Sequence, residues 1–470
     1  MANALEWSES EFGHADLGDE RRTRRLVKLA AEVAGRPAGT VTRACATSAS
    51  REGAFRLLEN ASVRPEALRN AVQDSTLRRC RAEERVFVAV DATSLTLTDK
   101  ERTKGFGAVG AWDQGARGVH AMTALAVTAA GATLGMCGQT TWVRETRSVH
   151  GRHQRRGHVS ESRFWLDILL DVRTAFAAAA PSCTPWFQMD RGADCWQVLT
   201  LASNLAMLVT VRAAYDRRLD DAAQRLWAKL ERAPVVAKRT IRVAARPVVY
   251  KKKRVNGQRI KLLVPPREAR TADVVIRAAK VPVVCMARDK ELTIELNAVL
   301  VSEVGRKRDP VEWMLLTTHS IRTRRDVLEV VRGYTLRWKI EEFHRAWKRG
   351  LCRVEDTQLR SRDAVYKWST ILAAVATRAM RLTQLARTTP DVPCTTELSK
   401  TELTALIALR EPKAFDQSTV PTLAVAVRWL ADLGGYTGPW NGPPGATVIG
   451  RGLHDVLIAA RAFENRDKKR

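Results

Sequence analysis

The segment from residue 334 to residue 348 places a stripe of polar side chains beside an apolar face, which predicts an amphipathic helix. At about 100° per residue, Arg337, Glu341 and Lys348 lie within about 60° of Tyr334 around the helix axis. The residues of the apolar side, which would pack against a core, are Leu336, Ile340, Phe343 and Trp347. A carboxylate flanked by a guanidinium and an ammonium group can hold a divalent cation while its neighbours hold phosphate oxygens. A solvated charged face is the simpler interpretation of one such helix, so the other segments decide between the two.

The chain of 470 residues carries a formal net charge of +27, and its basic residues are spread over the whole length. Such an excess predicts a polyanionic partner, with nucleic acid as the first candidate. We find no uninterrupted apolar run of about 18 residues and no signal-type N-terminus, so we expect a cytoplasmic protein without membrane association. The eight cysteines show neither C-x-x-C pairs nor zinc-ligand spacing, and we expect them to be reduced and buried.

The first 75 residues or so have the pattern of short helices. Residues 20–30 form a basic amphipathic segment that Gly35-Arg36-Pro37 would end, residues 50–58 follow as a second helix, and a third begins near Pro65. Short helices with arginines on one face suit a helix-turn-helix-like reader of duplex DNA. The alternative is a helical cap whose basic face is only solvated.

From about residue 84 the pattern changes to that of an α/β core. Residues 86–90 form an apolar run of strand length that ends in Asp91, and residues 186–189 lead into Asp190. Between them lie apolar segments of strand length at 120–129 and 134–142 and a helix expected over 162–179. Open α/β sheets place their sites at the carboxyl ends of strands, so both aspartates lie where a site is expected.

A β-rich insertion is expected over about residues 235–305. Residues 248–250 and 260–264 would pair as a hairpin, because Asn256-Gly257 between them is a strong turn signal. The basic connection of this hairpin either is solvated or lies along a phosphate backbone. After Lys348 the chain again has a helical pattern.

Asp91, Asp190 and Glu341 are acids in three distant segments, two at the ends of predicted strands and one on a predicted helix. A single aspartate after a strand is more often a turn or helix cap than a ligand. Phosphodiester chemistry, however, often uses two Mg²⁺ ions about 4 Å apart that carboxylates hold. Three carboxylates in a strongly basic protein therefore favour a metal site that acts on nucleic acid.

Three motifs together resemble the insertion-sequence-four family of DDE transposases. The spacing Tyr334-x2-Arg337-x3-Glu341-x6-Lys348 matches the family's signature. Asp91-Ala-Thr93-Ser94 is similar to its first acidic motif, and Asp190-Arg-Gly192-Ala-Asp194 is similar to its second, D-R-E-x-D, with Gly192 in place of the glutamate. The resemblance extends from about residue 7 to residue 350, and the tail matches only loosely.

This resemblance implies a ribonuclease-H-like core in which Asp91, Asp190 and Glu341 bind two Mg²⁺ or Mn²⁺ ions. Water and then the freed 3′-hydroxyl would attack phosphodiester bonds at the ends of the element, with a hairpin formed and resolved before the ends join target DNA. The protein would thus act as an endonuclease in DNA recombination. The residues implied to hold phosphates beside the cleavage point are Tyr334, Arg337 and Lys348.

Further DNA contacts follow from the same resemblance. Trp313 would receive a base flipped out of the stack, Trp338 would support the distorted end, and Arg212 would contact DNA. For either tryptophan alone, core packing is the more common role, since the chain has 13 tryptophans. On the basic N-terminal helix we expect Arg22 and Arg25 to contact DNA.

The expected organisation has three parts: a helical DNA-end-binding domain over 1–75, a catalytic domain with the β insertion over 76–365, and a helical C-terminal dimerisation domain over 366–470. The first hypothesis is a bacterial cut-and-paste DNA transposase that acts as a homodimer on paired terminal repeats and associates with the nucleoid when bound to DNA. The alternatives are a catalytically inactive DNA-binding inhibitor or domesticated derivative, and a nuclease that cuts without strand transfer. Intact Asp91, Asp190 and Glu341 argue against the inactive protein.

Overall fold

The computed structural model of the protein divides into two compact units. The first unit contains Met1–Gln188 and Leu336–Arg470, and the second contains Met189–Thr335. The structure describes residues 4–109, 115–144, 161–221, 224–243, 245, 248–255, 258–287, 290–306, 309–410, 420–439 and 442–467. Among the helices of these ranges, none is both long enough and apolar enough to span a membrane. Seven of the eight cysteines are buried and Cys195 is half-buried, with free thiols throughout.

The N-terminal region of the first unit is helical, as the sequence predicts. Its helices are α1 Ala4–Phe12, α2 Glu20–Gly35, α3 Val41–Ala44, α4 Ser48–Glu59 and α5 Pro65–Cys80. Asp19 caps α2 by accepting a hydrogen bond from a backbone N–H, and Thr47 begins α4 with a capping box. Pro65 stands at the first position of α5, where its missing N–H costs nothing. Local sequence signals therefore set where these helices begin.

A mixed α/β layer follows in the same unit, which confirms the predicted fold class. Its strands are β1 Arg85–Thr96, β2 Gly107–Ala108, β3 Arg117–Val127, β4 Thr133–Trp142 and β5 Thr184–Met189. β3 pairs antiparallel with β1 along one edge and with β2 and β4 along the other, and β5 lies beside β1. Helix α6, Ser162–Ala179, packs against β3 and β4. β1 is therefore an inner strand of this sheet.

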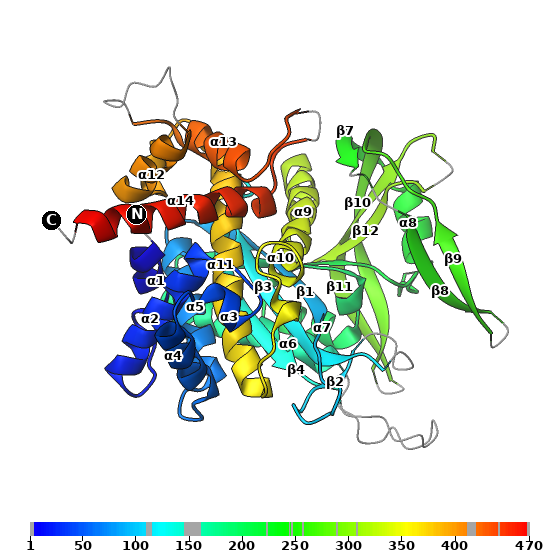
Figure 1. The fold of residues 1–470 in the computed structure, drawn as a ribbon. Helices are drawn as coiled ribbons and strands as arrows, with labels where there is room; N and C mark the ends of the chain where they lie inside the picture. The colour runs from blue at the N-terminus through cyan, green and yellow to red at the C-terminus, as the bar shows by residue number, and fades with distance from the viewer. Residues whose placement is uncertain are drawn as a thin grey trace. The chain divides into compact units, whose positions relative to one another are not determined.

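The last part of the first unit is helical again, as expected for the C-terminal region. Its helices are α10 Trp338–Lys348, α11 Arg362–Thr388, α12 Lys400–Arg410, α13 Leu423–Leu433 and α14 Ala446–Asp467. α11 is buried along most of its length and packs against α5, β4 and α14; Figure 1 shows it beside the blue N-terminal helices and crossed by the red α14. Lys367 donates hydrogen bonds of 2.8 Å to the carbonyls of Leu58 and Asn60, and Trp368 donates one of 2.7 Å to Gly39. α11 thus holds the N-terminal helices to the sheet.

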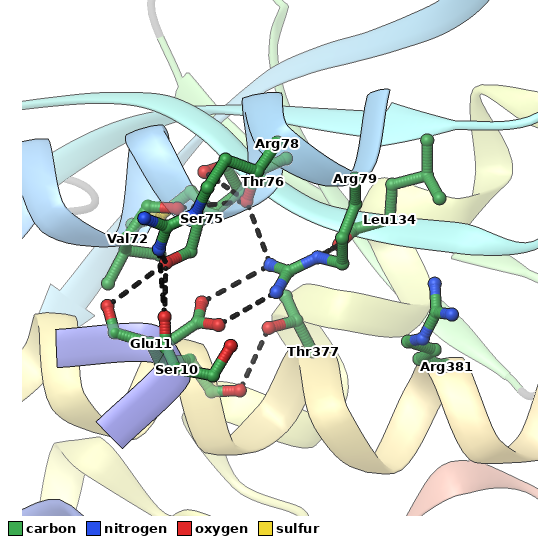
Figure 2. Close-up of polar contacts among 12 residues, drawn as sticks. Ser10, Glu11, Val72, Ser75, Thr76, Arg78, Arg79, Leu134, Thr377 and Arg381 are labelled. Carbon is green, nitrogen blue, oxygen red and sulfur yellow. Dashed lines mark hydrogen bonds and ion pairs between the residues drawn. The ribbon is translucent and has the colours of Figure 1, made fainter. Parts of the chain in front are cut away.

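A buried ion pair joins α1 to α5 within this unit (Figure 2). Arg79 Nη1 lies 2.9 Å from Glu11 Oε2, and the Glu11 side chain is only 2% exposed. Arg79 Nε also donates a hydrogen bond of 2.6 Å to the carbonyl of Leu134 on β4. Since Nη2 further bonds Thr76 Oγ1 at 3.2 Å, one guanidinium connects the first helix, the fifth helix and the sheet.

The second unit is rich in antiparallel strands, with helices at its ends. Its elements are α7 Trp196–Asn204, β6 Leu208–Arg212, α8 Leu226–Arg232, β7 Val235–Val243, β8 Val249–Val255, β9 Gln258–Val264, β10 Arg270–Ala287, β11 Lys290–Glu303, β12 Glu312–Thr317 and α9 Arg324–Leu336. Five strands form a sheet in the order β6, β12, β11, β10, β7, and all neighbours pair antiparallel. The expected hairpin is present as β8 paired with β9, although Asn256-Gly257 lies outside the described residues.

Candidate functional site

Asp91 lies within β1 and not at its end, which corrects the position expected from the sequence. The apolar run Val86–Val90 is at most 3% exposed, Asp91 is half-buried, and the strand continues to Thr96. The end of an apolar run marks the point where the strand leaves the packed interior, whereas the pairing of Asp91 with Thr123 of β3 continues the ladder. Asp91 therefore has regular strand backbone both before and after it in the chain.

The helix expected from Tyr334 to Lys348 is divided at Arg337. α9 ends at Leu336 and α10 begins at Trp338, with Arg337 in a right-handed helical conformation between them. Its carbonyl accepts a hydrogen bond of 3.0 Å from the N–H of Ile340, a tighter turn than the α-helical one. The predicted apolar face is confirmed, and its buried residues are Leu336, Ile340, Phe343 and Trp347.

The basic and acidic side chains of α10 meet the acid of β1. Arg337 Nη1 lies 3.4 Å from Asp91 Oδ2, and its Nη2 lies 3.6 Å from Glu341 Oε1. Lys348 Nζ donates a hydrogen bond of 3.0 Å to Thr93 Oγ1 of the same strand. Burial lowers the pKa of Lys348 from its usual value. The structure therefore brings four of the predicted motif positions, Asp91, Arg337, Glu341 and Lys348, into one cluster.

Glu355 supports this cluster, and the sequence analysis did not identify it. Its carboxylate lies 3.6 Å from Lys348 Nζ and accepts hydrogen bonds from the N–H of Thr96 at 2.9 Å and from Arg349 Nε at 2.7 Å. It lies seven residues after the end of α10, in the short 3₁₀ helix Val354–Asp356. Because it contacts both β1 and α10, Glu355 fixes the distance between the strand and the helix that carry the acids.

His344 is the second residue that sequence analysis missed. One of its ring nitrogens, one oxygen of Asp91 and one oxygen of Glu341 all lie within 4.8 Å of one another. The side chain is 7% exposed, and burial, with the charges of Lys348 and Arg337, lowers its pKa to about 3. The ring is therefore neutral at neutral pH, and this donor set fits a divalent cation. The available signal was the spacing of Glu341 and His344, since Glu-x-x-His places both side chains on one helix face.

Asp190 directly follows β5, as the sequence predicts, and belongs to the second unit. Its Oδ1 accepts a hydrogen bond of 2.8 Å from the N–H of Gly192, so it caps the short 3₁₀ turn that comes next. Asp194 of the same motif is buried and bonds Arg217 Nη1 at 2.6 Å and the N–H of Ala214 at 2.6 Å. Asp194 thus anchors the turn that carries Asp190.

Two further predicted residues of the second unit are in contact. Trp313 of β12 and Tyr334 of α9 lie edge to face, with ring centroids 5.4 Å apart and planes inclined by 62°. Tyr334 is buried, whereas Trp313 is half-buried. Arg212 Nη2 donates a hydrogen bond of 2.8 Å to the carbonyl of Glu312, beside Trp313. In the first unit, Trp338 is 48% exposed at the start of α10.

Arg22 and Arg25 on α2 are partly buried. Arg22 Nη1 donates a hydrogen bond of 3.0 Å to the carbonyl of Leu17, and Arg25 Nη2 donates one to the carbonyl of Ser50. Arg24 of the same helix is more accessible, with 68% of its side chain exposed. Both predicted arginines therefore also stabilise the connections around α2.

Fold and cluster together define a class of protein. A mixed sheet flanked by helices, with carboxylates on an inner strand and an adjacent helix beside cationic groups, is the ribonuclease-H-like arrangement of enzymes that use divalent cations on phosphodiester bonds. Residues 4–63 match the family model described as transposase DNA-binding, and residues 82–378 match the model described as transposase DDE domain. The second match covers more than half of the chain, so the chain belongs to the family of DDE transposases. This membership implies the use of a divalent metal and of DNA as a partner.

Proposed function

We propose that the protein is a cut-and-paste DNA transposase of the insertion-sequence-four type that binds transposon ends, cleaves them and joins them to target DNA. The observation that carries the proposal is the cluster of Asp91, Arg337, Glu341 and Lys348, in which Arg337 lies between the two carboxylates and Lys348 bonds Thr93 on the strand of Asp91. The family signature contains three of these four residues, Arg337, Glu341 and Lys348, together with Tyr334. An inactive DNA-binding derivative would not need this arrangement.

In this proposal Asp91, Asp190 and Glu341 hold two Mg²⁺ or Mn²⁺ ions. When bound, such ions activate the attacking oxygen and stabilise the leaving oxygen of a phosphodiester. Asp91 and Glu341 support the assignment because their oxygens and the His344 nitrogen already form a compact donor set. Asp190 is supported by chain connectivity, since it follows β5, the neighbour of β1 in the sheet.

The cationic side chains position the DNA backbone. Arg337 presents a planar fork that suits two phosphate oxygens, and Lys348 offers a compact charge next to Thr93. Tyr334, the remaining residue of the signature, would hold a phosphate as well. Each contact neutralises backbone charge near the scissile bond, which favours binding of a phosphate there.

The aromatic residues distort the end so that a hairpin can form. The 3′-hydroxyl reaches the opposite strand only after a sharp bend, and extruding one base permits this bend. Trp313 receives that base; its half-buried indole, held by Tyr334, has an accessible part for stacking. The exposed Trp338 supports the distorted end, and Arg212 contacts the backbone.

The N-terminal and C-terminal regions bind the transposon ends and bring two of them together. Residues 1–75 form the end-binding domain, with Arg22 and Arg25 toward DNA, residues 76–365 the catalytic domain with the β insertion at about 235–305, and residues 366–470 the dimerisation domain. A homodimer accounts for the coordination of two ends. The charge of +27 supports tight association with DNA, as in a bacterial nucleoid.

The test uses the full-length protein, Mg²⁺ or Mn²⁺, and labelled duplexes that carry the candidate terminal repeats, resolved on a denaturing gel. We expect nicks at the repeat boundary, a hairpin species, and joining of precleaved ends to a plasmid. Asp91→Asn, Asp190→Asn and Glu341→Gln should each abolish cleavage while end binding changes by less than about threefold, because most affinity comes from phosphate contacts. Binding without cleavage by the unmodified protein would identify an inactive derivative, and cleavage without joining would identify a simple nuclease.

A further inference from the structure

A buried histidine lies beside the two acids of the first unit, and neither the family signature nor the proposed function gives it a role. His344 follows Glu341 by three residues on α10, so their side chains lie on the same helix face about one turn apart. Asp91 faces them from β1, against which α10 packs. The three ligand atoms lie within 4.8 Å of one another.

The His344 ring is buried with one of its two nitrogens unpaired. The side chain is 7% exposed, and Nε2 has no hydrogen-bond partner among the described residues. Buried polar groups are nearly always paired, since an unpaired one loses its bonds to water without replacement. An imidazole kept only for packing would be better replaced by an apolar ring, so the unpaired nitrogen points to a ligand at this position.

The spacing of the three atoms is close to that of ligands on one ion. With metal–ligand distances of about 2.1 Å, two ligands at right angles are about 3 Å apart and two opposite ligands are about 4 Å apart. Since the three ligand atoms lie within 4.8 Å of one another, only small side-chain rotations are needed for all three to bond one ion. The inner strand and the buried face of α10 hold the backbones from which these side chains project.

We propose that His344 is a nitrogen ligand of the cation that Asp91 and Glu341 hold, and that it shifts the preference of this site from Mg²⁺ toward Mn²⁺. The inference rests on the proposed function for the existence of the acid site and adds the third ligand. Mg²⁺ strongly prefers oxygen ligands, whereas transition-metal ions accept imidazole readily. Glu341 and His344 then coordinate the ion from one face of α10, and Asp91 coordinates it from β1.

The experiment detects the bond itself. Full-length protein with no affinity tag is loaded with substoichiometric Mn²⁺, and pulsed electron paramagnetic resonance records whether ¹⁴N is coupled directly to the ion. The variants are His344→Leu, which removes the nitrogen and preserves an apolar volume, and His120→Gln as a matched control that removes another buried histidine of the same unit. Asp91→Asn reports whether the ion occupies the acid site, and circular dichroism confirms that each variant is folded.

We expect ¹⁴N coupling in the unmodified protein and in His120→Gln, and its loss in His344→Leu. The Mn²⁺ dissociation constant should rise about tenfold in His344→Leu, with a smaller rise for Mg²⁺. If Mn²⁺ binding depends on Asp91 but no nitrogen is coupled, the acid site stands and the role of His344 is wrong. If Asp91→Asn leaves Mn²⁺ binding unchanged, or if no Mn²⁺ binds, then the proposed acid site is wrong. The metal part of the proposed function is then wrong as well. For a His344→Leu protein that does not fold, the spectrum of the unmodified protein still decides.

Discussion

Arg337 is the residue that pairs with both carboxylates of the cluster. Its two terminal nitrogens face carboxylates from β1 and from α10, at 3.4 Å and 3.6 Å. A single guanidinium between two acids reduces their mutual repulsion. The same fork suits two phosphate oxygens, so Arg337 both assembles the acids and contacts the substrate of the proposed reaction. Lysine at this position would keep the charge and lose the fork.

Trp313→Ala separates the steps of the proposed reaction. If the indole stacks on the base extruded for the hairpin, as proposed, the first nick should proceed within about threefold of the normal rate. Hairpin formation should fall by about tenfold or more, which corresponds to one lost stacking contact of about 1–3 kcal/mol. Single-turnover assays on labelled ends measure both steps. An abasic nucleotide at the extruded position should restore part of the loss.

Tyr215→Ala is the control for this prediction, because Tyr215 is an exposed aromatic residue of the same unit with no proposed role in DNA binding, and removing it creates no cavity. The Trp313 variant also leaves Tyr334 without its ring contact. Equal slowing of nicking and hairpin formation by Trp313→Ala, with a lowered melting temperature, would show that the indole only packs against Tyr334.

His120 makes the stability of the first unit depend on pH. Its ring stacks on Trp142 with centroids 5.3 Å apart, and burial, followed by the nearby charge of Arg144, lowers its pKa; the charge of Glu161 opposes this only in part. The unfolded chain therefore binds a proton near pH 6.5 that the folded protein does not, and stability falls as the pH drops below that value. We expect the loss of melting temperature between pH 7 and pH 5 to be smaller in His120→Gln. His454→Gln is the control, and an identical pH profile in His120→Gln contradicts the prediction.

The sequence predicts the side chains that carry the proposed chemistry, but it does not predict all the side chains that hold them in place. Asp91, Arg337, Glu341 and Lys348 stand out because their spacing repeats a known signature, and the structure places them together. His344 and Glu355 do not stand out, since a buried imidazole and a supporting carboxylate depend on contacts between segments about 250 residues apart. The role of Asp190 stays a prediction.

Elements were predicted well where local signals are strong. The basic segment ended by Gly35-Arg36-Pro37 is α2, and the segment beginning at Pro65 is α5, because caps and helix-breaking residues act locally. Two details of the site region differ. β1 extends past Asp91, since pairing with β3 continues where burial ends, and the helix around the signature divides at Arg337. Both differences arise from tertiary contacts that periodicity does not contain.

The ion pair of Glu11 and Arg79 should contribute strongly to the attachment of α1 to α5. Glu11→Gln leaves the guanidinium, which also bonds Leu134, without its charged partner, and breaking a buried pair in this way costs about 3–5 kcal/mol. We expect the denaturant midpoint of the first unit to fall accordingly. The matched control is Glu52→Gln, whose pair with Arg56 is exposed on both sides and should contribute less than about 1 kcal/mol.

The double variant Glu11→Leu with Arg79→Met completes this test. It removes both charges together, so it should be less destabilised than Glu11→Gln alone, because no buried charge is left unpaired. Equal midpoints for Glu11→Gln and the unmodified protein would mean that water replaces the carboxylate and that α1 is held by its apolar face alone.

For the whole molecule, the proposed dimer should depend on exposed apolar side chains of the C-terminal helices. Leu409 on α12, Val425 on α13 and Ile458 on α14 are 43%, 38% and 44% exposed. We expect Leu409→Glu and Ile458→Glu to retain single-end binding and to lose the slower two-end complex on a native gel, because a charge would be buried at the interface. Leu170→Glu on α6, at an equally exposed leucine, is the control. Truncation inside α11 is a poorer test, since its buried core would be cut.

A two-end complex formed normally by both C-terminal variants, while Leu170→Glu also behaves normally, would show that these helices do not pair the protomers. If instead Leu170→Glu alone removes the complex, the pairing surface includes the catalytic domain. Sedimentation of each variant without DNA separates loss of dimerisation from loss of folding.

The hydrogen bonds that α11 makes to the N-terminal helices have a consequence for synthesis. Lys367 bonds the carbonyl of Leu58 across 309 residues of chain, which a ribosome adds in about 15–60 s at 5–20 residues per second. During that interval the first helices are outside the ribosome without the helix that covers them. We expect the N-terminal DNA reader to reach its final form only on a nearly finished chain, so that prematurely ended products compete poorly for the element's ends.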